Sequence, residues 1–333
     1  MKRILVTGGH GFLGSHVVEK LRERGHRVFA PHSSLYDLRK QTDIDSMYHV
    51  VRPDKVIHLA AACGGIGANQ ENSGKFFYDN IMMGAQMLEA ARVSGVSKFV
   101  QIGTACSYPK HCPVPFKEED LWNGFPESTN GAYGVAKRAL LTMCQAYRAQ
   151  YGVNAVYLIL TNLYGPRDEF RPHRSHAVAA LIKKCVDAKR NGDKEIIVWG
   201  DGTATREFLY VEDAADAIIA ATEKYDGGEP INIGSGTEIS IKDLVKEVSH
   251  VVGYKGDVVY DSGKPNGQPR RRLDVIRAKE LFGWESRTPL GEGLRKTVEW
   301  YLANRMWLEE VTTGAYRNWV ETNYAKRGAT CEA

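Results

Sequence analysis

The order of apolar runs and helical patterns is the feature that most restricts how this chain can fold. Nearly continuous apolar runs alternate with amphipathic helical patterns from the first residues onward. Runs of this kind are typical of parallel strands that are buried on both faces, with helices as the connections. We therefore predict an α/β protein with a doubly wound parallel sheet. The expected strands are residues 3–6, 27–30, 55–61, 98–104 and 154–165, and the clearest expected helices are residues 16–25, 78–95 and 131–152.

The pattern becomes looser after residue 165, where shorter helical and strand patterns alternate with loops. A length of 333 residues allows either two domains or one large domain with an added lobe. We expect a first domain at residues 1–165 and a smaller C-terminal lobe at residues 166–305, some of whose strands can join the main sheet. Residues 306–333 form a tail to which we assign no role.

Charge and composition argue against several classes of partner. The formal net charge is only +4 and no basic run follows one helix face, so nucleic acid is not an expected partner. No segment has the apolar length of a membrane span or a secretory signal, which predicts a cytoplasmic protein without a membrane partner. The six cysteines include no C-x-x-C pair, so we expect free thiols and no metal site.

The first expected strand ends in the glycine-rich turn TGGHGFLG, which precedes a helical pattern. Gly8, Gly11 and Gly14 allow a tight turn and a close approach of the backbone to a pyrophosphate, which then lies against N–H groups at the helix start. This context predicts a dinucleotide site. The alternative is a tightly packed turn that binds no ligand.

The segment after the second expected strand, FAPHSSLYDL, contains no carboxylate before Asp37. An acidic residue at this strand end binds the ribose 2′-hydroxyl of NAD, and it would repel the 2′-phosphate of NADP. The sequence therefore favours NADP(H), with NAD(H) still possible. The side chains available to a phosphate here are His10, His32, Ser33 and Ser34.

Tyr133 and Lys137 lie one helical turn apart in the segment YGVAK. An ammonium near a phenol stabilises the phenolate and lowers its pKa, so that tyrosine can act as an acid near neutral pH. A Tyr-x-x-x-Lys pair alone is common in helices. With the glycine-rich start and with Thr104 at the end of the preceding strand, it predicts a catalytic set.

These features resemble the extended short-chain dehydrogenase/reductase family, whose members act on nucleotide sugars. Longer segments are similar to the members that epimerise GDP-4-keto-6-deoxy-D-mannose at C3 and C5 and reduce it at C4, and this similarity extends to about residue 305. The matching residues are Thr7–Gly14, 58–61, Asn80, Thr104, Tyr133 and Lys137, and the longer segments are CGGIGAN, GTACSYPK, TNLYGPRDEFRPHRSHAVAALI, VWGDGTATREFLYVEDAA and KPNGQPRRRLDV.

The resemblance implies a role for each residue at the reacting sugar. Thr104 aligns the 4-oxygen, Tyr133 donates a proton to it, and Lys137 supports Tyr133 and holds the nicotinamide ribose. Cys106 is the base that removes protons at C3 and C5, and His176 is its partner acid. The implied cofactor contacts are Gly8, His10, Gly11, Phe12, Leu13, Gly14, Leu59, Ala60, Ala61, Tyr133, Lys137, Asn162, Leu163 and His176; the implied substrate contacts are Asn162, Lys184, Trp199, Gly200, Arg206 and Arg271.

Some residues depart from the family pattern. Serine is common where Ala105 and Thr104 stand, proline where Ala132 stands, and arginine where His10 stands. These changes leave open a related GDP-sugar epimerase that keeps NAD(P)+ tightly bound and catalyses no net redox reaction. A non-catalytic dinucleotide sensor is a further alternative, against which the intact Tyr133 argues.

The resemblance also implies a homodimer with a four-helix interface. The candidate helices are residues 78–93 and 136–151. Their apolar stripes would serve equally well as the surface that packs on the sheet, so the pattern alone does not separate the two uses.

Overall fold

The computed structural model describes residues 1–171, 175–264 and 266–312. Its largest feature is a six-stranded parallel sheet with the order β2-β1-β3-β4-β5-β9. The chain runs outward from β1 on one side and from β3 on the other, which is the doubly wound arrangement. The predicted fold class is confirmed. The strands are β1 (Arg3–Thr7), β2 (Arg27–Phe29), β3 (Lys55–His58), β4 (Lys98–Thr104), β5 (Ala155–Leu160) and β9 (Ile231–Ile233).

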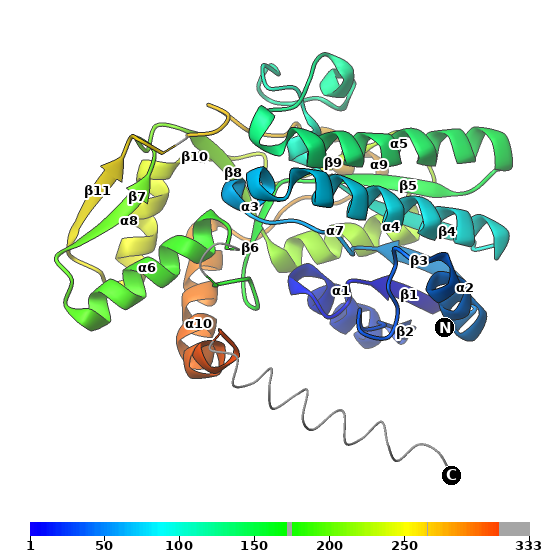
Figure 1. The fold of residues 1–333 in the computed structure, drawn as a ribbon, viewed down its shortest axis with the longest axis horizontal. Helices are drawn as coiled ribbons and strands as arrows, with labels where there is room; N and C mark the ends of the chain where they lie inside the picture. Colours follow the sequence, from blue (N-terminus) through cyan, green and yellow to red (C-terminus); the bar gives the residue numbers. More distant parts are fainter. Residues whose placement is uncertain (172–174, 265, 313–333) are drawn as a thin grey trace, which may run out of the picture.

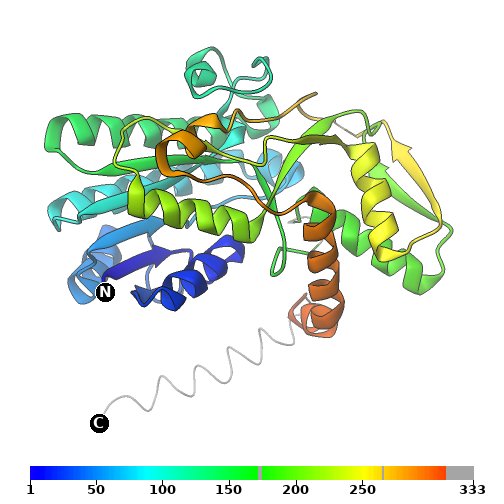
Figure 2. The ribbon, with the colours of Figure 1, turned by 180° about the vertical axis from the view of Figure 1, so that it is seen from behind.

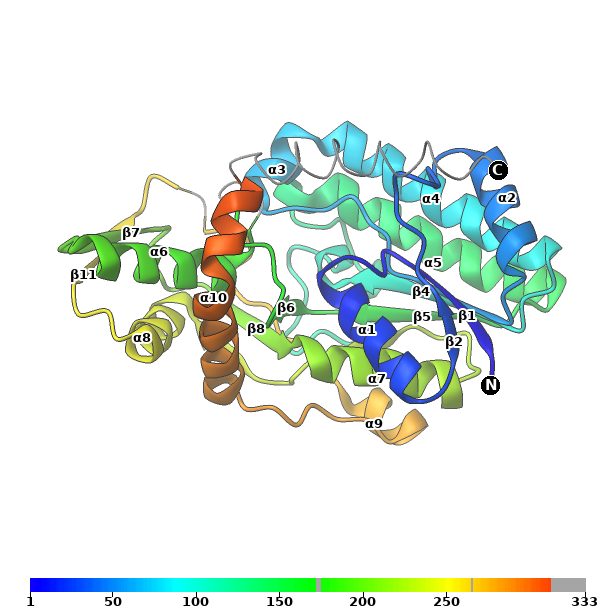
Figure 3. The same cartoon turned by 90° about the horizontal axis from the view of Figure 1, so that it is seen from below.

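Helices cover both faces of this sheet, as its continuous apolar strands require. One face packs against α1 and α7 and the other against α2, α4 and α5 (Figures 1 and 3). Neighbouring residues of β1 show the division, because Ile4 belongs to the first of these cores and Leu5 to the second. The helices of this part are α1 (Phe12–Glu23), α2 (Gln41–Val51), α3 (Ile66–Glu71), α4 (Ser73–Val93), α5 (Gly131–Tyr151), α7 (Val211–Lys224) and α9 (Ile276–Phe282), with the 3-10 turns η1 (Ala105–Ser107), η2 (Glu118–Trp122) and η3 (Ser128–Asn130).

A smaller lobe lies beside the main sheet and has its own apolar core (Figures 1 and 2). It contains a three-stranded sheet of order β10-β8-β6 and a two-stranded sheet of β11 and β7. No helix of the described residues is long and apolar enough to cross a membrane. The elements of the lobe are β6 (Asn162–Tyr164), α6 (Ala177–Asn191), β7 (Glu195–Trp199), β8 (Thr205–Tyr210), β10 (Glu238–Ser240), α8 (Ile241–Val252), β11 (Asp257–Asp261) and α10 (Leu290–Thr312).

The segment 154–165, predicted as one strand, forms two strands in different sheets. β5 pairs with β4 and β9, whereas β6 pairs with β8 in the lobe. Thr161 separates them, and its N–H donates to the carbonyl oxygen of Ile233 at 3.2 Å. The prediction was wrong here because both halves are apolar, so the pattern does not show the change of partner. Of the predicted tail, residues 306–312 continue α10, and residues 313–333 lie outside the described part.

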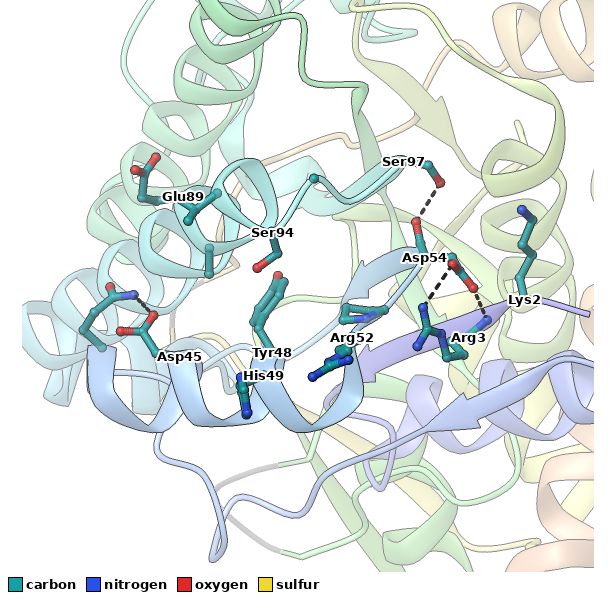
Figure 4. Close-up of a pocket in the computed structure, with 15 residues that line it drawn as sticks. Lys2, Arg3, Asp45, Tyr48, His49, Arg52, Asp54, Glu89, Ser94 and Ser97 are labelled. Atoms are coloured by element: carbon teal, nitrogen blue, oxygen red, sulfur yellow. Dashed lines mark hydrogen bonds and ion pairs between the residues drawn. The ribbon is translucent and has the colours of Figure 1, made fainter.

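The carboxyl ends of the parallel strands are where ligands bind in such folds. A hollow of about 360 Å³ lies on this side and is lined in part by Asn69, Ser128 and Tyr133. A larger hollow of about 640 Å³ lies at the opposite edge, at the amino ends of the strands (Figure 4). On its wall Arg3 pairs with Asp54, and the amide of Gln41 donates to Asp45 at 2.7 Å. We therefore place the candidate site at the carboxyl ends.

Candidate active site

The turn between β1 and α1 depends on glycine at two close approaches. Gly8 has a positive φ of 68°, and a Cβ on it would lie 2.8 Å from the backbone nitrogen of Ala60. A Cβ on Gly14 would lie 2.0 Å from the carbonyl oxygen of Gly8, so α1 starts directly against the turn. Gly11 caps α1 without a side chain, and the first turn has no acidic residue. The N–H groups of the first turn of α1 are therefore open to a phosphate.

The other predicted cofactor residues of this region lie around the same turn. The hydroxyl of Thr7 bridges β1 and β3, since it lies 2.7 Å from Nδ1 of His58 and accepts from the N–H of Ala60 at 3.4 Å. Burial lowers the pKa of His58 to about 3, so this histidine is neutral. Phe12 and Leu13 begin α1, and Leu59, Ala60 and Ala61 directly follow β3.

His10 and His32 stand together beyond the end of β2. Their ring centroids are 5.6 Å apart, and Nδ1 of His32 lies 2.8 Å from the hydroxyl of Ser34. All three side chains are exposed. Asp37, the first carboxylate after the strand, is bound by Arg39 at 2.8 Å, and this hydrogen bond lowers the pKa of Asp37 to about 2. The strand end thus offers polar donors with its nearest carboxylate already paired, which fits a 2′-phosphate.

Lys137 connects α5 to the end of β4. Its Nζ donates to the carbonyl oxygen of Ile102 at 3.1 Å and lies 5.8 Å from the ring centroid of Tyr133. The hydroxyl of Tyr157 donates to the carbonyl oxygen of Lys137 at 2.7 Å and helps to fix this part of the helix. Burial lowers the pKa of Lys137 to about 8, so the ammonium persists at neutral pH.

The phenol of Tyr133 keeps its proton in this environment. Burial raises its pKa, and the neighbouring Cys63 and Cys106 add to the rise. This differs from the expectation that Lys137 lowers the pKa of Tyr133, because burial disfavours the phenolate. A protonated phenol is the form that can donate to a ketone oxygen.

Cys106 is held at the junction of β4 and α5. It lies in η1, where its N–H donates to the hydroxyl oxygen of Thr104 at 3.2 Å. A Cβ on Gly134 would lie 2.5 Å from the carbonyl oxygen of Cys106, so the turn packs directly on the helix. Gly134 follows Tyr133 in the chain. The thiol, the threonine and the phenol therefore share one junction.

Arg271 brings a cation to this thiol from a distant part of the chain. Its Nη1 donates to Sγ of Cys106 at 3.3 Å, and the arginine is buried. Arg206 on β8 interacts with both groups: burial lowers the pKa of Arg206 to about 10, repulsion by Arg271 adds to this, and attraction by Cys106 opposes it. Two guanidinium groups thus lie near the predicted base.

His176 stands at the start of α6, beside the loop that follows β3. Its neighbour Ser175 lies against Gly65, in the loop after β3 that also carries Cys63. The side chains of His176 and Cys63 are accessible to water although protein atoms surround them, as expected for groups that line a cleft. Burial by these atoms disfavours the charged forms, which lowers the pKa of His176 and raises the pKa of Cys63.

The predicted substrate residues of the lobe divide into two groups. Trp199 is 54% exposed at the end of β7, and Nζ of Lys264 lies 5.3 Å from its ring centroid. Gly200 has a positive φ of 81°, and a Cβ on it would lie 2.1 Å from the side-chain oxygen of Asn266. Arg206 donates to the carbonyl oxygen of Asn266 at 2.9 Å. These residues form one surface around Asn266.

Lys184, Asn162 and Leu163 make other contacts. Nζ of Lys184 donates to the carbonyl oxygen of Ile197 at 2.8 Å. The side-chain amide of Asn162 donates to the carbonyl oxygen of Glu207 at 2.9 Å. Leu163 lies on β6 beside Asn162 and is partly buried. Their side chains, as placed here, stabilise the lobe and its junction with the main sheet, and their ligand contacts stay predictions.

Sequence reasoning missed two groups beside the site. Cys63 was expected only to be a free thiol without a role in the site, yet it interacts with Lys137, Cys106 and Asp168. Burial raises the pKa of Asp168 to about 7, and its Oδ2 has no hydrogen-bond partner among the described residues. Position in the loop that follows β3 was the available signal for Cys63. No set of three or more His, Cys, Asp or Glu side chains in the described residues is placed to hold a metal ion.

The glycine-rich turn and the Tyr133–Lys137 pair beside Thr104 define a nicotinamide-dependent enzyme of the extended short-chain dehydrogenase/reductase type. Residues 4–234 match the family described as the NAD dependent epimerase/dehydratase family. The chain belongs to this family, and the resemblance stated from sequence is confirmed.

Similar proteins of this family act on GDP-sugars. A GDP-L-fucose synthase of Sinorhizobium fredii is 42% identical over 303 residues, which cover 91% of this chain and 96% of the relative. A GDP-6-OMe-4-keto-L-xylo-heptose reductase from C. jejuni has a TM-score of 0.87 and 27% identity, and the match covers 91% of this chain and 98% of that one. A GDP-L-fucose synthetase from Naegleria fowleri bound to NADP has a TM-score of 0.83 and 29% identity, with 91% and 94% covered.

Proposed function

We propose that the protein is a GDP-sugar 3,5-epimerase/4-reductase that converts GDP-4-keto-6-deoxy-D-mannose to GDP-L-fucose with NADPH. The observation that carries this proposal is the shared junction of Cys106, Thr104 and Tyr133. It combines a candidate base for carbon–hydrogen bonds with a proton donor for the ketone in one cleft. The similarity to GDP-L-fucose synthases over most of the chain supports the same substrate.

Epimerisation uses the acidity that a 4-ketone gives to the hydrogens on C3 and C5. Cys106, as the thiolate, removes one of these protons, and the electron pair moves into an enolate. His176 returns a proton to the opposite face and inverts the centre. The cation of Arg271 at 3.3 Å from the sulfur supports the charged form of the base.

Reduction follows at the same ketone. Thr104 holds the 4-oxygen, and Tyr133 donates its proton to that oxygen as negative charge develops there. The Lys137 ammonium lies where it stabilises the resulting phenolate. The proposed order is epimerisation before reduction, because reduction removes the ketone that acidifies the carbon–hydrogen bonds.

The chain's residues fit NADP(H) as the cofactor. The open N–H groups of α1 suit the pyrophosphate, and His10, His32 and Ser34 suit the 2′-phosphate. When bound, the cofactor supplies the hydride for C4. The NADP-bound relative from Naegleria fowleri supports this choice.

The diphosphate and base of the substrate are assigned to the lobe. Trp199 offers an exposed ring edge, Gly200 a close backbone approach, and Arg206 a cation with the fork geometry that suits phosphate. Lys184, Asn162 and Arg271 complete the proposed substrate contacts.

We assign the protein to a homodimer in the cytoplasm. The packed pair α4 and α5 carries exposed apolar side chains at Phe77, Tyr78, Val93 and Tyr151, which suits a four-helix interface with a second copy. A reducing compartment keeps the Cys106 thiol free. Light scattering that gives a monomer mass at micromolar concentration would contradict the dimer.

Mass spectrometry of the product formed in deuterated water tests the proposed function. With GDP-4-keto-6-deoxymannose and NADPH, we expect a reduced product that carries deuterium at C3 and C5. Cys106→Ser should lose both deuteriums and still reduce a ketone supplied already epimerised. Cys112→Ser is the matched control, since its side chain packs against a core of the main sheet, and it should behave as wild type.

Other outcomes distinguish the alternatives. Reduction without deuterium would mean a simple 4-reductase and would remove the role of Cys106. No reaction with this substrate, together with NAD(P)+ released on denaturation, would favour an epimerase without net redox chemistry. A Tyr133→Phe variant with unaltered biological activity would favour the non-catalytic sensor.

A further inference from the structure

The guanidinium of Arg271 donates hydrogen bonds to two side chains, those of Cys106 and Gln268. Nη1 donates to Sγ of Cys106 at 3.3 Å, and Nε donates to Oε1 of Gln268 at 3.2 Å. The amide of Gln268 in turn donates to the carbonyl oxygens of Pro109 and Lys110 at 3.1 and 3.0 Å. Both acceptors lie just after Cys106 in the same loop. The guanidinium is therefore positioned on the thiol by protein contacts alone.

The charges around Cys106 leave this cation free to act on the sulfur. Among residues 1–171, 175–264 and 266–312, no carboxylate forms an ion pair with Arg271. Arg270, its neighbour, pairs instead with Glu238. Glu127 interacts with Arg206 and accepts from the N–H of Thr129 at 3.0 Å. The titratable groups that interact with Cys106 come from different elements and are Arg206, Arg271, Cys63 and Tyr133.

We propose that Arg271 is a positioning residue that keeps Cys106 as the thiolate and orients its sulfur toward the substrate, with Gln268 holding the guanidinium in place. This inference rests on the proposed function, in which Cys106 is the base. A cation within hydrogen-bond distance favours the charged form of a thiol and so raises the fraction of reactive base. Arginine suits this task because it does not lose its own proton.

The proton balance of the step is simple. The thiolate takes a proton from C3 or C5 and becomes a neutral thiol, and the C–H electron pair moves into the enolate. Arg271 neither gains nor loses a proton. The thiolate returns when the thiol gives its proton to solvent, and the nearby guanidinium favours this step as well.

This role is different from the diphosphate contact that the sequence predicted for Arg271. A diphosphate ligand would change the affinity for GDP-sugar. A thiolate partner would change the reactivity of Cys106 even when no nucleotide is present.

Alkylation of Cys106 by iodoacetamide without substrate separates the two roles. Iodoacetamide is small and uncharged and reacts with thiolate, so peptide mapping over time reports the thiolate fraction of Cys106 at neutral pH. Arg271→Met should slow alkylation of Cys106 by about tenfold, since one lost pairing of this kind corresponds to roughly a tenfold change in thiolate. Arg271→Lys should restore part of the rate.

Arg270→Met is the matched control, because it removes the same charge one residue earlier, where the partner is Glu238. It should leave alkylation of Cys106 unchanged. Gln268→Met should give an intermediate rate, since it frees the guanidinium without removing it. Deuterium exchange at C3 and C5 should fall in the same order across these variants.

Equal alkylation rates for Cys106 in wild type, Arg271→Met and Arg271→Lys would overturn the inference. If Arg271→Met does not fold by circular dichroism, Gln268→Met and Arg271→Lys decide the matter, and wild-type alkylation in both would overturn it. Slower alkylation combined with no deuterium exchange by the wild-type enzyme would uphold the thiolate assignment and refute the proposed function.

Discussion

The groups proposed for reduction and those proposed for epimerisation are assembled in different ways. Tyr133 and Lys137 share one helix, and Thr104 ends the strand beside it. Cys106 sits at the same junction, but Arg271 reaches it across 165 residues of sequence. His176 comes from the start of α6 in the lobe. Reduction thus depends on one α/β layer, whereas epimerisation depends on contact between that layer and the lobe.

The two activities should therefore be separable by mutation. Substitutions within α5 should act mainly on reduction, and substitutions at the lobe contact should act mainly on proton exchange. Only substitutions that shift the backbone of the shared junction should affect both.

The largest effect is expected from Tyr133→Phe, which removes the proposed proton donor without emptying its space. Reduction should fall by about 10²- to 10⁴-fold, the usual contribution of general acid catalysis. Exchange at C3 and C5 should stay within a few-fold of wild type. NADPH consumption and deuterium incorporation, measured on the same sample, give the two rates. A parallel loss of both would mean that the activities are not separable.

Gly134→Ala should lower both activities together, because its Cβ would meet the carbonyl oxygen of Cys106 at 2.5 Å. The resulting shift at the junction should cost about 10- to 100-fold in each rate, as small misplacements in active sites do. Gly74→Ala is the control, since a Cβ there meets nothing within 4 Å. Loss of only one activity in Gly134→Ala would show that the junction is not shared.

The pH dependence should distinguish the two activities by a factor of about ten at pH 9. Burial lowers the pKa of Lys137 to about 8, so its ammonium is present below that pH and is lost as pH rises through it. The kcat/KM for reduction should therefore decrease about tenfold for each pH unit above 8. Removal of the C3 and C5 protons, the first half of exchange, depends on a thiolate, which higher pH does not remove. A matching decrease in exchange would contradict this separation.

The smallest effect is expected at the cofactor's 2′-phosphate. The double substitution His10→Ala and His32→Ala should raise KM for NADPH by roughly a few-fold, the scale of exposed charge contacts, and leave KM for NADH unchanged. His111→Ala, a surface histidine in another loop, is the control. An equal rise in KM for both cofactors would mean that these histidines maintain the structure of the turn and do not contact the 2′-phosphate.

The parts of the site that were predictable from sequence are the local ones. A helical period places Tyr133 and Lys137 on one face, and the end of an apolar run marks Thr104 and Cys106 at the edge of the sheet. The contact of Arg271 with Cys106 was not predictable, because three successive arginines follow Pro269 and nothing local says which of them points at the thiol.

The same limit applies to the fold. Burial on both faces makes a strand recognisable but says nothing about which strand lies beside it. The break at Thr161 was missed for that reason, although the alternation of strands and helices correctly predicted a doubly wound parallel sheet.

β9 pairs with β5 after the chain has already passed through α6, β7 and β8 of the lobe. A gene divided after residue 165 would therefore leave the first fragment with an unpaired sheet edge along β5 and the second with a strand that has no sheet to join. Such fragments would be expected to aggregate when made alone and to recover activity only when made together. The two parts of the gene must therefore be inherited together. A recombination event that exchanges the lobe must carry β9 and α7 with it, or the resulting protein will not fold.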